Sequence, residues 1–529
     1  MAEKDKVILA IDHGTSGAKT ALVTVHGKVL DWAFKETPIY FMEERAVEQD
    51  PDEWWDAILE TSKKLIDKGT VQVEDIVGIC NTSLWSTVVP LDKDGNHLMR
   101  AMSWMDSRGE PQTKKVFGGF PQVSGYNIGK ILKWLKVTGA GPSLAGVDTV
   151  SHIMWIREKR PDIYEKTYKF LEPQDWVNMK FTGKYAASFS SSMLCWVSDI
   201  RDIHNVKYSD DLCKITKIDK EKLGELKQSI EVLGPITNEI SDELGLEKDT
   251  KVVMGAPDVF AAAIGAGTVE NYQAHACLGT STWLMLHVPQ KGTDIDHQFG
   301  AIPSALPGKY ILTNEQHTAG GALSYLRDNV LYHKDELLQE AEVPDVYKIF
   351  DKIVEGVEPG SKNLIFTPWL HGERAPVSDP FIRGGLFNLS LDHNREHVIR
   401  AVFEGIAYNM RWLHMYIEKF KTVNRRVDNI HLIGGGANSN IWCQVIADVM
   451  QRTMLQMKDP IQANSRGAAL IGSLGLGYIK EEEIPKCVEV ANVYKPNPEL
   501  KPVYDKLFKE YVNIYNGMKK ICKRLNSTP

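Results

Sequence analysis

The chain begins with two short apolar runs that are separated by a polar turn. The runs at 7–11 and 18–25 have the length of strands, and DHGTSG lies between them. Further short runs predict strands at 76–81 and 87–91. A turn that combines two glycines with two hydroxyl residues offers many hydrogen-bond donors at the end of a strand.

Residues 51–67 repeat apolar side chains every three or four positions, which predicts a helix with one buried face. Asp50 can cap this helix, Pro51 suits its first turn, and Glu53 is the expected capping-box partner. Because strands and helices alternate along this part of the chain, the pattern predicts an α/β protein.

A second strand–turn–strand pattern appears later in the chain. The segment ACLGTSTWLML at 276–286 again has an apolar run, Gly-Thr-Ser and a second apolar run. The two Gly-Thr-Ser triplets begin at 14 and 279, half the chain length apart. This spacing predicts an internal duplication with two similar domains that face each other. We place their boundary after residue 264, which gives domains at 1–264 and 265–529.

A third glycine cluster follows another predicted strand, at 429–433. Three glycines come next, and then a helix that Ser439 or Asn440 can cap. Glycine-rich turns let backbone N–H groups approach an anion closely. Two such turns on facing domains can bind the phosphates of one nucleotide, with Gly434–Gly436 beside the base. Neither GxxxxGK[ST] nor GxGxxG occurs, which excludes a P-loop and a Rossmann site.

The composition narrows the range of functions. The formal net charge is -7 without a long basic run, so a nucleic-acid partner has no electrostatic support. No apolar stretch reaches the roughly 18 residues of a membrane span. The seven cysteines form no CxxC pair, which argues against a zinc site and a disulfide framework. Scattered cysteines of this kind fit a cytoplasmic protein with reduced thiols. The sequence leaves open whether the protein forms a homodimer.

The segment GGLFNLSLDHNREHVIRAVFEGIAYN at 384–409 resembles the second signature of the FGGY carbohydrate kinases, relatives of actin, hexokinase and the Hsp70 ATPase domain. DHGTSGAK, SWMDSRG, MGAPDVFAAAIGAG, LGTS and GGGANSNIW resemble further family elements in the same order, whereas His152 stands where a lysine is expected. The resemblance implies two actin-like (ribonuclease H-like) domains around an interdomain nucleotide cleft. It also implies ATP and Mg²⁺ as cofactors, and transfer of the γ-phosphate to a sugar or polyol hydroxyl.

The resemblance assigns roles to individual residues. Asp258, at the start of a predicted helix, matches the catalytic aspartate; a helix cap is the alternative role, and the two are compatible. Asp12, at the end of the first strand, is the expected Mg²⁺ ligand through water. The positions that match nucleotide contacts are Gly14, Thr15, Ser16, Lys19, Gly279, Thr280, Gly320, Ser324, Gly435, Gly436, Ala437 and Asn438.

The substrate side departs from the family pattern. At 84–87 this chain has Leu-Trp-Ser-Thr, where family members that bind xylulose carry Gln-Met-His-Gly and glycerol kinases carry Gln-Arg-Glu. Val259 stands where the family often has Gln or Asn. Apolar side chains form no hydrogen bonds with substrate hydroxyls and discriminate poorly between sugars. We therefore expect a substrate other than plain glycerol. A xylulose-type ketopentose is the default, and another polyol, ketose or sugar acid is the alternative. The candidate substrate residues are Trp85, Ser86, Trp104, Asp106, Arg108 and Asp258.

Two alternatives remain open at this point. The tryptophans and the Asp106–Arg108 pair could be structural instead of binding hydroxyls or an acidic group. The rival for the whole chain is a non-catalytic actin-like protein that uses ATP as a conformational switch. Fold analogy alone does not decide between these functions.

Overall fold

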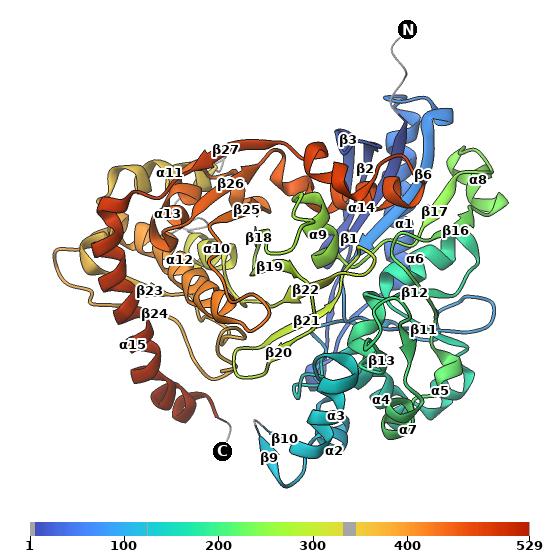
Figure 1. The fold of residues 1–529 in the computed structure, drawn as a ribbon, viewed down its shortest axis with the longest axis horizontal. Coiled ribbons are helices and arrows are strands. Elements are labelled where there is room, and N and C mark those ends of the chain that lie inside the picture. Colours follow the sequence, from blue (N-terminus) through green and yellow to red (C-terminus); the bar gives the residue numbers. More distant parts are fainter. Residues whose placement is uncertain (1–5, 124, 332–344, 528–529) are drawn as a thin grey trace.

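The computed structural model describes residues 6–123, 125–331 and 345–527. It has two lobes that lie side by side, each built on a central sheet (Figure 1). The first sheet has the strand order β16-β17-β6-β1-β2-β3. Its strands are β1 (Val7–Gly14), β2 (Gly17–Thr24), β3 (Val29–Glu36), β6 (Ile76–Ser83), β16 (Val232–Pro235) and β17 (Lys251–Val253).

The second sheet repeats the topology of the first. Its order is β20-β21-β22-β19-β18-β25-β26-β27. Its strands are β18 (Ala274–Leu278), β19 (Thr282–Val288), β20 (Thr293–Asp294), β21 (Phe299–Pro303), β22 (Tyr310–Thr313), β25 (Asn429–Ile433), β26 (Thr453–Met457) and β27 (Val490–Tyr494). β18 pairs antiparallel with β19 and parallel with β25, as β1 does with β2 and β6. The repeated topology confirms the predicted α/β class of two related domains.

The predicted first helix is confirmed as α1 (Pro51–Asp67), but its capping was only partly predicted. Asp50 is the N-cap, and its side chain accepts a hydrogen bond from the N–H of Asp52. The prediction for Glu53 is wrong. Its carboxylate accepts a hydrogen bond from the hydroxyl of Tyr40 at 2.6 Å and forms no capping box.

The remaining helices surround the two sheets. They are α2 (Glu110–Phe117), α3 (Ile128–Thr138), α4 (Thr149–Lys159), α5 (Pro161–Lys166), α6 (Pro173–Thr182), α7 (Asp210–Thr216), α8 (Asn238–Leu244), α9 (Asp258–Gly265), α10 (Gly320–Asn329), α11 (Val346–Gly356), α12 (Arg395–Lys419), α13 (Asn440–Met450), α14 (Ala463–Gly475) and α15 (Lys501–Asn526). Among the described residues, none of these helices is both long and apolar enough to cross a lipid bilayer.

Short strands complete the outer parts of the lobes. They are β4 (Tyr40–Phe41), β5 (Val47–Gln49), β7 (Val89–Leu91), β8 (Ala101–Met102), β9 (Gln122–Val123), β10 (Tyr126–Asn127), β11 (Lys169–Leu171), β12 (Ala186–Ser188), β13 (Ser198–Asp199), β14 (Lys207–Tyr208), β15 (Glu225–Lys227), β23 (Ile365–Thr367) and β24 (Gly385–Phe387). The strand predicted at 87–91 begins two residues later, as β7. Val88 forms only an isolated bridge with Met102, and Ser86, which precedes the predicted strand, has a left-handed φ of 63°.

Helix α14 joins the two lobes, because it lies between β26 and β27 of the second sheet in the chain but packs on β1, β2 and β6 of the first. It crosses α9, which lies between the sheets in Figure 1. A Cβ atom at Gly265 would lie 1.8 Å from the carbonyl oxygen of Ala463, and one at Gly467 would lie 1.9 Å from that of Ala261. The two helices therefore approach as closely as only glycine allows.

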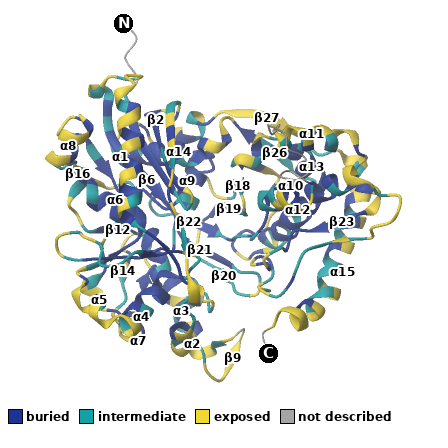
Figure 2. Cartoon of the chain, turned by 180° about the vertical axis from the view of Figure 1, so that it is seen from behind, coloured by how far each residue is buried: buried dark blue, intermediate teal, exposed yellow. Residues whose placement is uncertain are grey.

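The largest group of buried apolar side chains extends through both lobes. It includes Ile8 and Ala10 of the first sheet, Phe260 of α9 and Leu278 of the second sheet. Figure 2 shows buried residues along the sheets and the helices between them, and exposed residues along the outer loops. The lobes therefore share one core, which fixes the first residues of α9 in the middle of the molecule.

Candidate active site

The first Gly-Thr-Ser segment forms the tip of the β1–β2 hairpin, as the sequence predicts. Gly14 and Thr15 are half-buried and Ser16 is exposed, so their donors remain accessible. A Cβ atom at Gly17 would lie 2.3 Å from the carbonyl oxygen of Lys35, so no larger residue fits there. This close packing gives the tip a fixed shape.

Asp12 and Lys19 lie directly opposite each other in this hairpin and form an ion pair at 3.1 Å. Both side chains also contact residues at the start of α14 or just before it. The ammonium group of Lys19 donates to the carbonyl oxygen of Ile461 at 3.1 Å, and the amide of Asn464 donates to Asp12 at 3.4 Å. The hairpin therefore faces the other half of the chain, as a phosphate-binding turn between two domains requires.

Asp258 is the first residue of α9, and its side chain is only partly exposed. Pro257 occupies the N-cap position, and the Asp258 carboxylate accepts a hydrogen bond from the N–H of Val259 at 2.8 Å. Burial above all, and then the negative charges of Asp12 and Glu315, raise the pKa of Asp258 to about 7. A carboxyl group that titrates near neutral pH is suited to accept and release a proton.

The second Gly-Thr-Ser segment is the turn between β18 and β19, and it packs against the first residues of α10. The N–H of Gly320 donates to the carbonyl oxygen of Gly279 at 2.9 Å, and the N–H of Ala319 donates to that of Thr280 at 2.8 Å. A Cβ atom at Gly320 would lie 2.7 Å from the Gly279 carbonyl oxygen. The predicted contact positions of the second turn and of α10 therefore lie together.

The third glycine loop, at 434–438, forms a short 3₁₀ helix after β25, and Ser439 caps α13 behind it. Helix α11, which the sequence analysis did not single out, contacts both this loop and α10. Asp351 of α11 accepts a hydrogen bond from the Ser439 hydroxyl at 2.6 Å, and the hydroxyl of Tyr347 lies 2.9 Å from that of Ser324. α11 therefore connects two of the predicted nucleotide segments.

Within the third loop, every predicted position has a defined environment. Gly435 has open space where a Cβ atom would sit, whereas a Cβ atom at Gly436 would lie 2.5 Å from the indole ring of Trp442. Ala437 is buried, and the amide of Asn438 donates to the carbonyl oxygen of Gly435 at 3.2 Å. The loop therefore presents a flat, fixed backbone surface near Gly435.

Trp104 connects the first phosphate turn with the predicted substrate loop. Its indole N–H donates to the hydroxyl of Thr15 at 3.0 Å, and the hydroxyl of Thr87 accepts a bond from its backbone N–H at 3.2 Å. The indole of Trp85 contacts Phe260 of α9 at a ring distance of 5.2 Å. The two predicted tryptophans therefore both contact elements that carry predicted site residues, the first turn and α9.

Asp106 and Arg108 form a compact pair away from solvent. Asp106 is fully buried, and the guanidinium group of Arg108 contacts both of its carboxylate oxygens at 2.6 to 3.1 Å. Arg108 also donates to Glu48 at 2.6 Å and stacks over Trp155 at 4.4 Å. In this conformation the pair is occupied by partners within the lobe, and a direct contact with substrate stays a prediction.

Three residues near Asp258 or Asp12 were missed by sequence reasoning. Cys277, Glu315 and Asn464 lie in three different segments. Burial raises the pKa of Cys277 to about 12, and the charges of Asp258, Asp12 and Lys19 act on the same thiol. The only sequence signal for Cys277 is its place just before the second turn. No local sequence pattern identifies Glu315 or Asn464.

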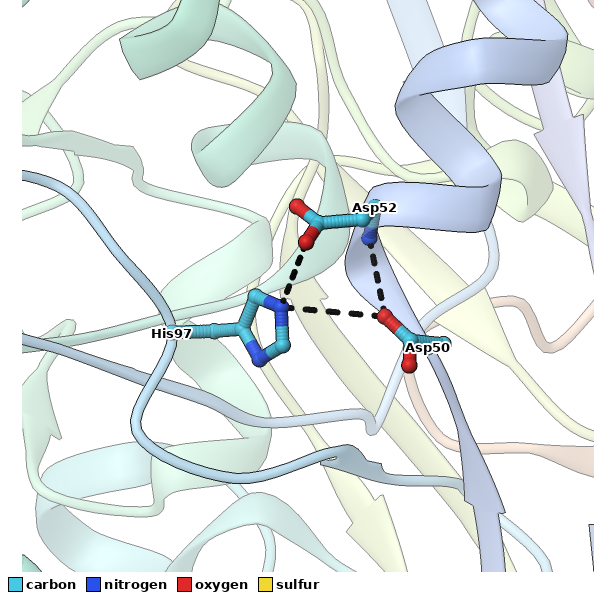
Figure 3. Close-up of side chains that lie close together, drawn as sticks. All are labelled: Asp50, Asp52 and His97. Atoms are coloured by element: carbon cyan, nitrogen blue, oxygen red, sulfur yellow. Dashed lines mark hydrogen bonds and ion pairs between the residues drawn. The ribbon is translucent and has the colours of Figure 1, made fainter.

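A separate group of potential cation ligands, Asp50, Asp52 and His97, lies at the start of α1 (Figure 3). Among the described residues it is the only such group of three. The carboxylate of Asp50 already has two partners, because it caps α1 and forms an ion pair with Arg100 at 3.5 Å. The group is therefore explained as part of the helix cap.

The family of the chain follows from a comparison with family models. The model for the N-terminal domain of the FGGY family of carbohydrate kinases matches residues 7–265, and the model for the C-terminal domain matches residues 274–476. The chain belongs to the FGGY family of carbohydrate kinases. It is therefore a sugar phosphotransferase, and its family implies ATP as the phosphoryl donor.

Individual relatives cover the whole chain. Xylulose kinase of Bacillus subtilis is 28% identical over 99% of both chains, and gluconokinase of the same species is 24% identical over 89% of this chain and 88% of its own. Among solved structures, gluconate kinase from Lactobacillus acidophilus has a TM-score of 0.85 at 24% identity and covers 99% of this chain and 100% of its own. The ligand-bound xylulose kinase of that species has a TM-score of 0.83 at 24% identity, and the match covers 97% of this chain and 98% of its own. These structures confirm the fold.

Several predictions from the sequence stay predictions. They concern the boundary after residue 264, the individual site residues, a homodimer, the lack of a nucleic-acid partner and a cytoplasmic location. The structure brings the predicted phosphate turns, Asp12, Lys19 and Asp258 toward the middle of the molecule, where the two lobes meet.

Proposed function

We propose that this kinase phosphorylates a neutral ketose or polyol, with a xylulose-type ketopentose as the first candidate, and that Asp258 is the catalytic base. The observation that carries the proposal is the position of the Asp258 carboxylate. It lies at the start of α9 in the middle of the molecule, and its pKa is raised to about 7. The substrate names of the relatives support the first candidate.

Asp258 acts on the attacking hydroxyl. As the hydroxyl oxygen forms its bond to the γ-phosphorus, the bond from that phosphorus to the leaving ADP oxygen breaks, and the hydroxyl proton passes to the Asp258 carboxylate. A buried carboxylate with a pKa near 7 accepts this proton more readily than an exposed one, and it can release the proton after turnover.

The two turns position the nucleotide. Thr15 and Ser16 of the first turn, and Gly279 and Thr280 of the second, offer backbone and hydroxyl donors to phosphate oxygens. Mg²⁺, when bound, neutralises phosphate charge. Asp12 fits such an ion because it offers the oxygen ligands that Mg²⁺ prefers. Its partner Lys19 has a flexible side chain that can turn to the phosphates instead.

The arginine among the predicted substrate residues and the arginine beside Glu315 favour a neutral substrate over a sugar acid. Arg108 already binds the carboxylates of Asp106 and Glu48, and Arg374 binds Glu315 at 2.7 Å. An aldonate carboxylate would need a cation that is free to pair with it. Both arginines have carboxylate partners, so the neutral substrate has the lower desolvation cost.

The proposal is tested with a panel of substrates and one variant. ADP release from Mg-ATP is measured with ketopentoses, polyols and aldonates, and the product is identified by mass spectrometry. We expect efficient turnover of a neutral ketose or polyol. Asp258→Asn should bind ATP normally and lose turnover by roughly a thousandfold, because it removes a general base and its charge.

Two results would contradict the proposal. Near-normal turnover by Asp258→Asn would exclude this residue as the base. A clear preference for gluconate over every neutral sugar would exclude the proposed substrate class and would favour the sugar acid that the alternative relatives are named for.

A further inference from the structure

We propose that Gln174 and Asn178 of α6 are positioning residues that hold the turn from which Asp258 extends. The proposal rests on the role proposed above for Asp258. Neither amide belongs to the phosphate turns or to the substrate loop. Their effect on the reaction is therefore exerted through the backbone that carries the base.

Both side chains donate to one carbonyl oxygen. The amide of Gln174 lies 2.6 Å from the carbonyl oxygen of Met254, and the amide of Asn178 lies 2.7 Å from it. The two residues are four positions apart on α6, so they lie on the same face of the helix. Both are fully buried. Two donors use both lone pairs of this oxygen, which fixes the plane of the peptide group.

The orientation of the amides follows from this acceptor. A carbonyl oxygen can only accept, so each side chain must present its NH₂ group to Met254. The oxygen of Asn178 then faces Asn81, whose NH₂ group donates to it at 2.7 Å. Asn81 lies in β6, three residues before the substrate loop begins. A chain of amide hydrogen bonds thus connects the end of β6 with the turn after β17.

The turn itself has little freedom. Residues 254–257 connect β17 with α9, and Gly255 has a φ of 74°, which favours glycine. A Cβ atom at Gly255 would lie 2.1 Å from the carbonyl oxygen of Asn81. The N–H of Gly255 donates to the carbonyl oxygen of Ser229 at 2.8 Å. The backbone at Met254 and Gly255 is therefore held by several contacts, and Asp258 follows three residues after Gly255.

The amides at this position have an energetic cost. The side-chain oxygens of Gln174 and Asn81 are buried and have no hydrogen-bond partner among the residues that the structure describes. An unpaired buried acceptor costs about 1 to 3 kcal/mol. Apolar side chains of similar size would avoid that cost. The side-chain oxygen of the control residue Gln112 is unpaired in the same way, so the proposal rests on the two bonds to Met254 and not on this cost.

The same helix also holds the substrate loop. Glu172, which precedes α6, accepts a hydrogen bond from the N–H of Thr87 at 2.9 Å. Asp175 accepts a bond from the hydroxyl of Ser191 at 2.8 Å, and the carbonyl oxygen of Ser191 accepts the indole N–H of Trp85 at 3.0 Å. Helix α6 therefore fixes the substrate loop and the base relative to each other.

The test compares three variants that each replace a buried amide with an apolar side chain. Gln174→Met and Asn178→Leu remove one donor each from Met254. Gln112→Met is the matched control, since Gln112 is buried in the same lobe but bonds Glu158 of α4 instead. We expect kcat to fall about 10- to 100-fold in the first two variants, as for a small misplacement of a catalytic group. The KM for sugar and the affinity for Mg-ATP should change less than about threefold.

The outcomes separate the proposals. Unchanged kcat in folded Gln174→Met and Asn178→Leu, with only a lower melting temperature, would overturn the positioning role. An equal loss of kcat in Gln112→Met would do the same. Asp258→Asn is measured in parallel, and normal turnover there would instead reject the role of the base. If Asn178→Leu does not fold, Gln174→Met decides, because it leaves one donor and keeps the side-chain length.

Discussion

The chemistry of Asp258 depends on residues that lie far from it in the sequence. In addition to burial, the negative charges of Asp12 in the first hairpin and of Glu315 in the segment before α10 raise the pKa of its carboxyl group. The sequence identifies Asp258 through its family motif. It could not predict the raised pKa, because burial and neighbouring charge arise only when the two lobes meet. Cys277 was missed for the same reason.

The raised pKa predicts an acid limit for the reaction. Below about pH 7, Asp258 is increasingly protonated and cannot accept the hydroxyl proton, so kcat/KM should fall about tenfold per pH unit. Glu315→Gln removes a negative charge that raises this pKa, so the acid limb should move to lower pH. A pH profile of kcat/KM measures both effects.

Glu270→Gln is the control for this profile, since Glu270 is exposed and has no part in the environment of Asp258. An acid limb that stays in place in Glu315→Gln, or one that lies below pH 5 in the unaltered enzyme, would contradict the proposed base.

Whole elements were predictable where their signal is local. The helix at 51–67 was predicted to the residue, because its periodicity, its N-cap Asp50 and Pro51 at its first position are all local signals. The bond between Glu53 and Tyr40 was not predictable, since β4 is a separate element. Likewise, the sequence analysis did not single out α6. Its bonds to Met254 depend on how it packs beside β17.

Three histidines on neighbouring strands hold the segment after α9. His275 of β18 lies 3.3 Å from the hydroxyl of Thr268, and His287 of β19 lies 2.7 Å from its carbonyl oxygen. His431 of β25 lies 2.6 Å from the carbonyl oxygen of Ala266. Burial lowers the pKa of His275 to about 3 and of His287 to about 4, and it also lowers that of His431.

These lowered pKa values predict loss of stability in acid. The folded state keeps the rings neutral, whereas the unfolded chain binds protons below about pH 6.5. The free energy of unfolding should therefore decrease as the pH falls from about 6.5 toward 4. His275→Gln should flatten this dependence by about 1.4 kcal/mol per pH unit, the effect of one proton. Denaturant titrations at several pH values measure the slope.

For comparison, His26→Gln replaces an exposed histidine and should leave the slope unchanged. If both variants keep the full slope, the histidines behind α9 do not control the acid stability of the fold.

At the scale of the whole molecule, the repeated Gly-Thr-Ser segments predicted two related domains, and the sheet topologies agree. The sequence did not indicate that α14 covers the first sheet. A helical pattern shows that one face is buried, but not which sheet covers it. The close crossing of α9 and α14 is likewise visible only in three dimensions.

The crossing predicts a strong effect of one methyl group. Gly467→Ala places a Cβ atom 1.9 Å from the backbone of Ala261, so α9 and α14 must separate. We expect a loss of about 3 kcal/mol in the free energy of unfolding, as for overpacked cores. Gly517→Ala is the matched control in α15, where no atom lies within 4 Å of the new Cβ atom. It should stabilise the protein by up to about 1 kcal/mol. Equal stability of both variants in thermal unfolding would contradict this account.

The position of α14 also has a consequence for synthesis of the protein. A nascent chain leaves the ribosome from its N-terminus, so the strands of the first sheet emerge by residue 253. The helix that covers Ile8 and Cys80 ends only at residue 475. Until then, the first lobe has an uncovered apolar face, the kind of surface that chaperones bind. The first lobe can therefore be completed only after α14 has been made, although its own strands are made first.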